Sequence, residues 1–179
     1  IDLDSVAENE SISRLDVLIH ELSHYAYYNY IAEHADEIRG RESYQQLPVH
    51  LDDNTALQAA LNMDLMKQIF EYLKEPNSNY TNFNQSLMNL LFGVIDYNPD
   101  SNTYTGYHGL LTDSGLRFDE IADSFSENDA TFFLEYPDEL NTVTKELFAE
   151  IVRLYSCNPN NIPPAIQDLI YPFRIPVNY

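Results

Sequence analysis

The 179-residue sequence is poor in cysteine, tryptophan and basic residues. It has one cysteine, no tryptophan, and 9 lysines and arginines against 29 aspartates and glutamates. The single Cys157 excludes an internal disulfide and a cysteine-rich metal site, and it leaves oxidising and reducing compartments both open. The formal net charge of −20 argues against binding to nucleic acid or to an anionic membrane surface. Partners are therefore expected to be neutral or basic, although such a charge also serves solubility alone.

Long apolar runs are absent as well. No stretch reaches the ~20 residues that a transmembrane helix needs, so we expect no membrane insertion. The start at Ile1 shows no charged-then-apolar leader, and the missing initiator methionine suggests a processed or excised fragment, which leaves the earlier loss of a leader open. The length fits one domain, and no repeat or hinge-like boundary interrupts it, so the expected organisation is a single domain over residues 1–179.

One short motif carries a specific chemistry. His20 and His24 enclose Glu21 in a His-Glu-x-x-His pattern. On an α-helix, residues four apart lie on one face, so two imidazoles can bind one metal ion, and this motif is typical of zinc hydrolases. Glu21 would lie beside the ion rather than on it, where a carboxylate can accept a proton from water.

The surroundings of the motif predict a helix. Apolar residues recur mostly at three- and four-residue steps, which indicates an amphipathic helix from a cap at Ser13 to about Arg39, before Gly40. These apolar positions are Leu15, Leu18, Ile19, Leu22, Ala26 and Ile31. The alternative is a pair of histidines packed in a helical core and bonded to backbone. His34 lies on a different face and is expected at the surface.

The rest of the chain also predicts mainly helices. They are expected from Asp53 or Asn54 to Pro76 and over 85–95, 117–125, 127–136, 141–155 and 164–171. Residues 44–51 are the one early candidate for an edge strand, and 96–109 form the longest turn-rich stretch. The expected fold class is therefore mainly α, with α+β possible if a small sheet forms.

Two histidines do not complete a zinc site, which normally takes a third protein ligand. Some enzymes with this motif use a third histidine shortly downstream, but Tyr30 stands at that position here. Others take a glutamate from a later helix. Glu146 and Glu150 lie four apart on the predicted 141–155 helix, so one can bind zinc while the other orients a histidine ligand. The alternative is that both belong to a solvated helix face.

The second motif resembles a known family. The stretch Lys145-Glu146-Leu147-Phe148-Ala149-Glu150-Ile151-Val152-Arg153-Leu154 is similar to the Glu-Phe-Phe-Ala-Glu-Ala-Phe-Arg-Leu segment of the anthrax lethal factor type of metallopeptidase. Asn158-Pro159 and the 164–171 helix also resemble that group's C-terminal end. The resemblance implies a zincin-like fold of the gluzincin type, with Glu146 as the zinc ligand and Glu150 as its supporting partner. Such enzymes are secreted or host-directed peptidases.

The chain departs from that family in three places. Its two motifs stand about 120 residues apart, Ser23 replaces a family glycine, and a family tyrosine falls on Glu139, with Tyr136 the nearest candidate. His108 in the turn-rich stretch and Tyr136 are the candidates to stabilise a developing oxyanion. Tyr104 and Tyr107 share that stretch.

Together these patterns predict a zinc-dependent endopeptidase that acts on protein or peptide substrates. We expect Zn²⁺ on His20, His24 and Glu146, with Glu21 as the base. The resemblance implies a secreted location or transfer into a host cell as a toxin or effector, while a cytoplasmic location stays open. Two other hypotheses are a zinc-binding but inactive interaction domain and a helical binding protein without metal. Only 19 residues precede the motif, which leaves little room for the sheet that usually forms the upper wall of the active-site cleft in such enzymes. That wall is either missing or built from 44–51 and 96–110.

Overall fold

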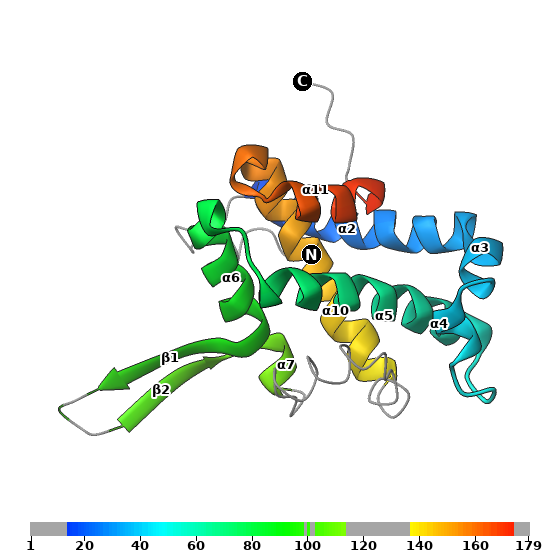
Figure 1. The fold of residues 1–179 in the computed structure, drawn as a ribbon, viewed down its shortest axis with the longest axis horizontal. Helices are drawn as coiled ribbons and strands as arrows, with labels where there is room; N and C mark the ends of the chain where they lie inside the picture. The colour runs from blue at the N-terminus through cyan, green and yellow to red at the C-terminus, as the bar shows by residue number, and fades with distance from the viewer. Residues whose placement is uncertain (1–13, 99, 101–102, 114–136, 174–179) are drawn as a thin grey trace.

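Three long helices make the centre of the molecule. The computed structural model describes residues 14–98, 100, 103–113 and 137–173. In this part, α2 (Arg14–Glu33), α5 (Asp53–Lys74) and α10 (Pro137–Cys157) pack around a shared apolar core (Figure 1). The expected mainly helical class is confirmed for these residues. No described helix has the length and hydropathy needed to cross a bilayer. The single-domain organisation stays a prediction.

Helix α5 supplies the largest share of the core. Its apolar residues recur at helical spacing over 22 residues, and both Met63 and Met66 are buried among them. Its N-cap is Asp52, one residue before the predicted Asp53 or Asn54: the Asp52 carboxylate accepts hydrogen bonds from Thr55 N (3.0 Å) and Oγ1 (2.6 Å). A cap of this kind stabilises a helix by ~1 kcal/mol. The helix ends at Lys74, shortly before Pro76, as proline requires.

Helix α2 buries only part of the predicted apolar stripe, with Ile31 buried and Ile19 packed against the core. Ser23, Tyr27 and Ile31 are buried, whereas Leu15, Leu18 and Leu22 are 63%, 46% and 40% exposed. The predicted stripe is therefore wrong at those three leucines. Tyrosine is amphipathic, so the buried face combines Tyr27 with small and polar residues and gives almost no hydropathy signal.

The predicted continuous helix to Arg39 is also wrong in one respect. It is interrupted at His34, and a short helix α3 (Ala35–Arg39) follows. The break turns the chain toward α5. Arg39 binds Asp36 within α3 (2.7 Å) and Asp53 at the start of α5 (2.6 Å). Gly40 follows α3 as predicted.

The predicted edge strand at 44–51 does not form. Helix α4 (Glu42–Gln45) occupies its first residues, and the remainder is turn. Ser43 is buried against α5, where its hydroxyl donates to Asp64 Oδ2 (3.1 Å), and Arg41 Nη1 binds the same carboxylate (3.1 Å). These tertiary contacts outweigh the weak strand pattern that Tyr44, Leu47 and Val49 suggested.

The chain forms a β-hairpin where a helix end and a loop were predicted. After η1 (Ser78–Tyr80), helix α6 (Thr81–Phe92) ends at Gly93, whose φ of 82° leaves the helical region. Strands β1 (Gly93–Asn98) and β2 (Thr103–His108) then pair antiparallel, from Gly93 opposite His108 to Asn98 opposite Thr103. Alternating β-branched and aromatic residues favour this pairing, a signal that the Asn-Pro and glycines obscured.

The hairpin projects outward from α6, well to one side of α2 and α10 (Figure 1). It therefore does not provide the expected wall over the motif helix, and residues 44–51, which end α4 and continue as turn, form no strand that could do so. Helix α7 (Leu110–Asp113) follows and packs on α6. The helices predicted over 117–125 and 127–136 fall outside the described residues.

The C-terminal elements follow the prediction closely. Helix α10 buries its apolar face between α2 and α5, and η2 (Pro159–Asn161), α11 (Pro164–Ile170) and η3 (Tyr171–Phe173) close the core. Pro164 opens α11 in the first turn, where the missing N–H costs nothing. The six predicted apolar positions of α10 are buried or packed on the core. They are Val143, Leu147, Phe148, Ile151, Val152 and Leu154.

A buried chain of polar groups joins the three long helices. The Tyr27 hydroxyl on α2 donates to Asn62 Oδ1 on α5, and Asn62 Nδ2 donates to Asn141 Oδ1 on α10 (2.8 Å). Asn141 Nδ2 in turn donates to the Thr55 carbonyl (3.5 Å). Burial raises the pKa of Tyr27 far above its ordinary value, so the hydroxyl stays a donor. The network fixes α2 and α10 relative to each other through α5.

Candidate metal centre

The crossing of α2 and α10 brings the two sequence motifs together. His20 and His24 lie one turn apart on α2, and Glu146 and Glu150 lie one turn apart on the facing side of α10. The 3.6-residue period makes each pair share a face. Tyr27 and Phe148 are buried beside them and hold the helix faces in contact through the ring of Phe173.

Three side chains converge on one point. Candidate ligand atoms of His20, His24 and Glu146 all lie within 4.8 Å of one another. Glu146 Oε2 is 3.2 Å from His20 Nε2, and Glu146 Oε1 is 3.4 Å from His24 Nε2. The two imidazole rings are 4.9 Å apart and nearly perpendicular.

These distances fit a tetrahedral metal site. Charge-assisted N–H···O bonds are usually ~2.7–2.9 Å long, so 3.2 and 3.4 Å are long for a hydrogen-bonded pair. Ligand atoms at ~2.0–2.2 Å from a tetrahedral zinc ion lie about 3.3–3.6 Å from each other. The donor set of two imidazoles and one carboxylate is also that of a catalytic zinc site. The three residues could therefore hold a metal ion.

Glu150 orients the first histidine. His20 Nδ1–H donates to Glu150 Oε1 at 2.8 Å, which fixes a proton on Nδ1 and leaves Nε2 facing Glu146. The other Glu150 oxygen accepts from Arg153 Nε (3.1 Å), and Arg153 Nη2 lies 3.0 Å away. Sequence reasoning missed Arg153, although its position three residues after Glu150 is the spacing at which helical side chains pair.

The titration behaviour of the cluster follows from these bonds. The hydrogen bond to Glu150 raises the pKa of His20 above its ordinary value, although desolvation acts the other way. The same bond, with help from Arg153, lowers the pKa of the Glu150 carboxyl. Burial lowers the pKa of His24 and so favours its neutral form. Glu150 is therefore an anionic partner of His20, and His24 is a neutral ligand candidate.

His24 depends on one nitrogen for its polar contacts. Its Nδ1 is buried and has no hydrogen-bond partner within the described part of the chain. Its Nε2 faces Glu146. Metal binding would use Nε2, the nitrogen that faces Glu146, whereas the buried Nδ1 would still need a partner of its own.

The cluster is open to solvent. The side chains of His20 and His24 are 18% and 16% exposed, and that of Glu146 is 36% exposed, so water or a substrate group can reach a fourth position. Glu21 is exposed beside the pair. It stands about 100° round the helix from His20 and about 60° from His24, next to the ligands but outside the converging group.

Comparison of the chain with family models, curated proteins and solved structures gives no match. A function therefore has to be inferred from the geometry of α2 and α10 and from the sequence motifs.

The remaining predicted site residues are not brought to the cluster in the described part of the chain. Tyr136 lies outside the described residues, immediately before α10. The backbone of His108 ends β2 opposite Gly93, and its side chain also lies outside what is described. The assignment of either as an oxyanion donor stays a prediction.

Proposed function

We propose that this chain is a zinc-dependent endopeptidase. The observation that carries the proposal is the convergence of His20, His24 and Glu146 with Glu150 bonded behind His20. Two imidazoles and a carboxylate are the donors of many catalytic zinc sites, and a carboxylate bonded behind a histidine ligand is common in them, so this arrangement supports the proposal. The exposed Glu21 alongside is a group that could act as a base.

Each residue then has a defined part in hydrolysis. His20, His24 and Glu146 would hold the ion, which when bound polarises a carbonyl and lowers the pKa of a water toward ~7. Glu21 accepts a proton from the attacking water as the water oxygen bonds to the scissile carbonyl carbon. Glu21 then donates that proton to the amide nitrogen as the C–N bond breaks. The products are one peptide with a new C-terminal carboxylate and one with a new N-terminal amine. Glu150 and Arg153 hold His20 in position throughout.

The finer assignments belong to the same proposal. A zincin-like arrangement of the gluzincin type, and a secreted or host-directed toxin or effector protease, are supported by the resemblance of the 145–154 stretch to the lethal factor type. The strongly acidic composition is compatible with such a location and favours neutral or basic substrates.

A zinc-binding interaction domain without activity is the second candidate. One observation favours it: Leu15, Leu18, Leu22 and Tyr25 form an exposed apolar stripe along α2, next to Glu21. Such a stripe on the motif helix suits contact with another protein. A metal-free helical protein is the third, and zinc content alone separates it from the other two.

The decisive experiment combines zinc content with cleavage. Elemental analysis of the purified protein should give about one zinc per chain, and mass spectrometry should detect new termini in a mixture of unfolded and proline-rich peptides. Glu21→Gln should abolish cleavage while zinc stays near one equivalent, because it removes the base and no ligand. Glu75→Gln, an equal charge change at an exposed site, is the control.

Three results would contradict the proposal in distinct ways. Full zinc content without cleavage of any peptide supports the interaction domain. Substantial activity in Glu21→Gln removes Glu21 as the base. Absence of zinc after loading at neutral pH removes the metal site itself.

A further inference from the structure

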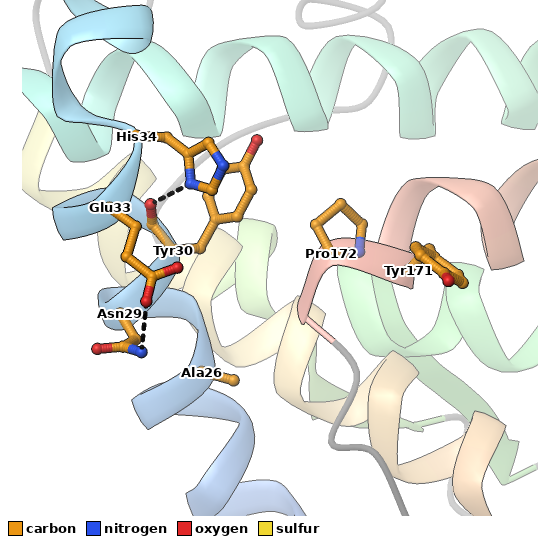
Figure 2. Close-up of a pocket in the computed structure, with 7 residues that line it drawn as sticks. All are labelled: Ala26, Asn29, Tyr30, Glu33, His34, Tyr171 and Pro172. Carbon is orange, nitrogen blue, oxygen red and sulfur yellow. Dashed lines mark hydrogen bonds between the residues drawn. The ribbon is translucent and has the colours of Figure 1, made fainter.

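A pocket on the other side of α2 has the composition of a binding site. It lies between the C-terminal half of α2 and the η3 turn and has a volume of about 470 Å³, within the ~300–1,000 Å³ typical of ligand sites. Figure 2 shows the two walls: Glu33 and Asn29 project from α2, and Pro172 and Tyr171 face it from η3. Tyr30, His34 and Ala26 line the remainder.

The inner wall is held rigidly. The Tyr30 ring stacks on His34 with centroids 4.1 Å apart and an interplanar angle of 18°. The same ring meets Phe173 edge to face at 4.9 Å, and Phe173 is buried in the core. Side chains fixed in this way lose little conformational freedom when a ligand binds.

The polar groups of the pocket are mainly hydrogen-bond acceptors. His34 Nδ1 must donate, because its partner at 2.9 Å is the Tyr30 carbonyl oxygen, so Nε2 of the neutral ring is an acceptor. Asn29 Nδ2 donates to Glu33 Oε1 (3.3 Å), which leaves the Asn29 amide oxygen as an acceptor. Glu33 adds the carboxylate. A ligand matching this lining carries donors and positive charge.

The charge around the pocket also favours a ligand with positive charge. Among the residues that the structure describes, neither lysine nor arginine lines it. The arginines of the neighbouring α3 corner are already paired: Arg39 binds Asp36 and Asp53, and Arg41 binds Glu37 (2.7 Å) and Asp64. The net charge of −20 favours the approach of cations to the molecule as a whole.

We propose that this pocket binds an arginine side chain of a peptide or protein partner. The guanidinium group is planar, has five N–H donors and stacks on aromatic rings, so it can pair with Glu33 while lying against Tyr30 or Tyr171. Glu33 lies nine residues after His24, about 14 Å along α2 and about 180° round it. The pocket is therefore separate from the metal centre and does not depend on the proposed activity.

The test uses two matched peptides on the full zinc-loaded chain. An acetylated and amidated Gly-Ala-Arg-Ala-Gly peptide is compared with the same peptide carrying citrulline, which keeps the shape and removes the charge. Binding is followed by NMR shifts of the Tyr30 and His34 rings, with peptide integrity checked by mass spectrometry. We expect saturable shifts with the arginine peptide. Binding of the citrulline peptide should be about two- to fivefold weaker.

Variants locate the site. Glu33→Gln and Tyr171→Ala should each weaken the arginine peptide by about two- to fivefold. Glu75→Gln changes the net charge equally at an exposed position outside the pocket and should leave binding unchanged. Zinc content should be the same in all three variants. Equal binding of the two peptides, equal losses in Glu33→Gln and Glu75→Gln, or no saturable shift overturns the proposal.

Discussion

Glu146 and Glu150 have the same side chain but different positions relative to His20. Glu146 contacts Nε2 of His20 and also reaches His24, whereas Glu150 contacts only Nδ1 of His20 and is bound on its far side by Arg153. The first position suits the proposed ligand, and the second suits the proposed supporting partner. Spacing alone left the two interchangeable; the contact with Arg153 distinguishes them.

The two glutamates should therefore respond differently to removal. Glu146→Ala should lose most bound zinc after mild chelation, because it takes one ligand from three. Glu150→Ala should remain metallated, with affinity or activity reduced by ~10–100-fold. Competition of each variant against a chromophoric chelator measures this. A reversed order would make Glu150 the ligand. Wild-type behaviour in both would place the third ligand elsewhere, and His108 would then be the first candidate.

The polar network of the core is important at the scale of helices. Asn62 is fully buried and serves both Tyr27 on α2 and Asn141 on α10, so one amide joins the two helices that carry the candidate ligands. A buried network is costly when it is only partly satisfied. This dependence makes Asn62 a position where polarity, not volume, matters.

Asn62→Leu keeps the number of side-chain heavy atoms but removes the partner of the Tyr27 hydroxyl and of the Asn141 amide oxygen. We expect the free energy of unfolding to fall by about 1–3 kcal/mol, and zinc affinity to fall as α2 and α10 lose their common tie. Urea denaturation of the metal-free protein and chelator competition measure the two effects. Tyr72→Phe is the matched control, since its half-exposed hydroxyl bonds Asn84 (2.6 Å), whose oxygen can turn to water. Similar losses in both variants would contradict the role of the buried network.

The base of the hairpin depends on a close backbone approach. A Cβ atom at Gly109 would overlap Gly93 N and Leu91 O, whereas at Gly40 its nearest neighbour is Glu37 O at 3.3 Å. Gly109→Ala should therefore lower the free energy of unfolding by about 1–3 kcal/mol, because backbone atoms have to move. Gly40→Ala should be close to neutral. Thermal or urea unfolding of the two variants checks this, and equal stabilities would show that the hairpin base rearranges freely.

Sequence patterns predicted the parts of the fold in which hydropathy follows burial. The extents of α5, α10 and α11 are close to the predicted ones because leucine, isoleucine and phenylalanine form their inner faces. The motif residues were identifiable because ligand chemistry restricts residue type and spacing. The inner face of α2 was not, since Tyr27 and Ser23 are buried there while leucines remain exposed. The hairpin was hidden because glycine and proline favour both loops and turns.

At the scale of the whole molecule, zinc should act as a stabilising ligand. An ion held by α2 and α10 binds the folded chain and not the unfolded one, so free zinc at ~100 times Kd should add about 2.7 kcal/mol to the free energy of unfolding. Denaturation with and without a chelator measures the difference. His24→Ala should abolish it, while Glu21→Gln should keep it. A zinc effect that survives in His24→Ala would place the bound ion at another site.

The crossing of α2 and α10 also determines when the centre can be completed. His20 and Glu146 are 126 residues apart in sequence, and His20 and Glu150 are 130 apart. During synthesis Glu146 emerges from the ribosome 126 residues after His20. Closing so long a segment is a late, slow event compared with forming the local α5 and α6 helices. An ion bound at the proposed centre would therefore report that folding is complete, and a single backbone cut between the two motifs is expected to release it.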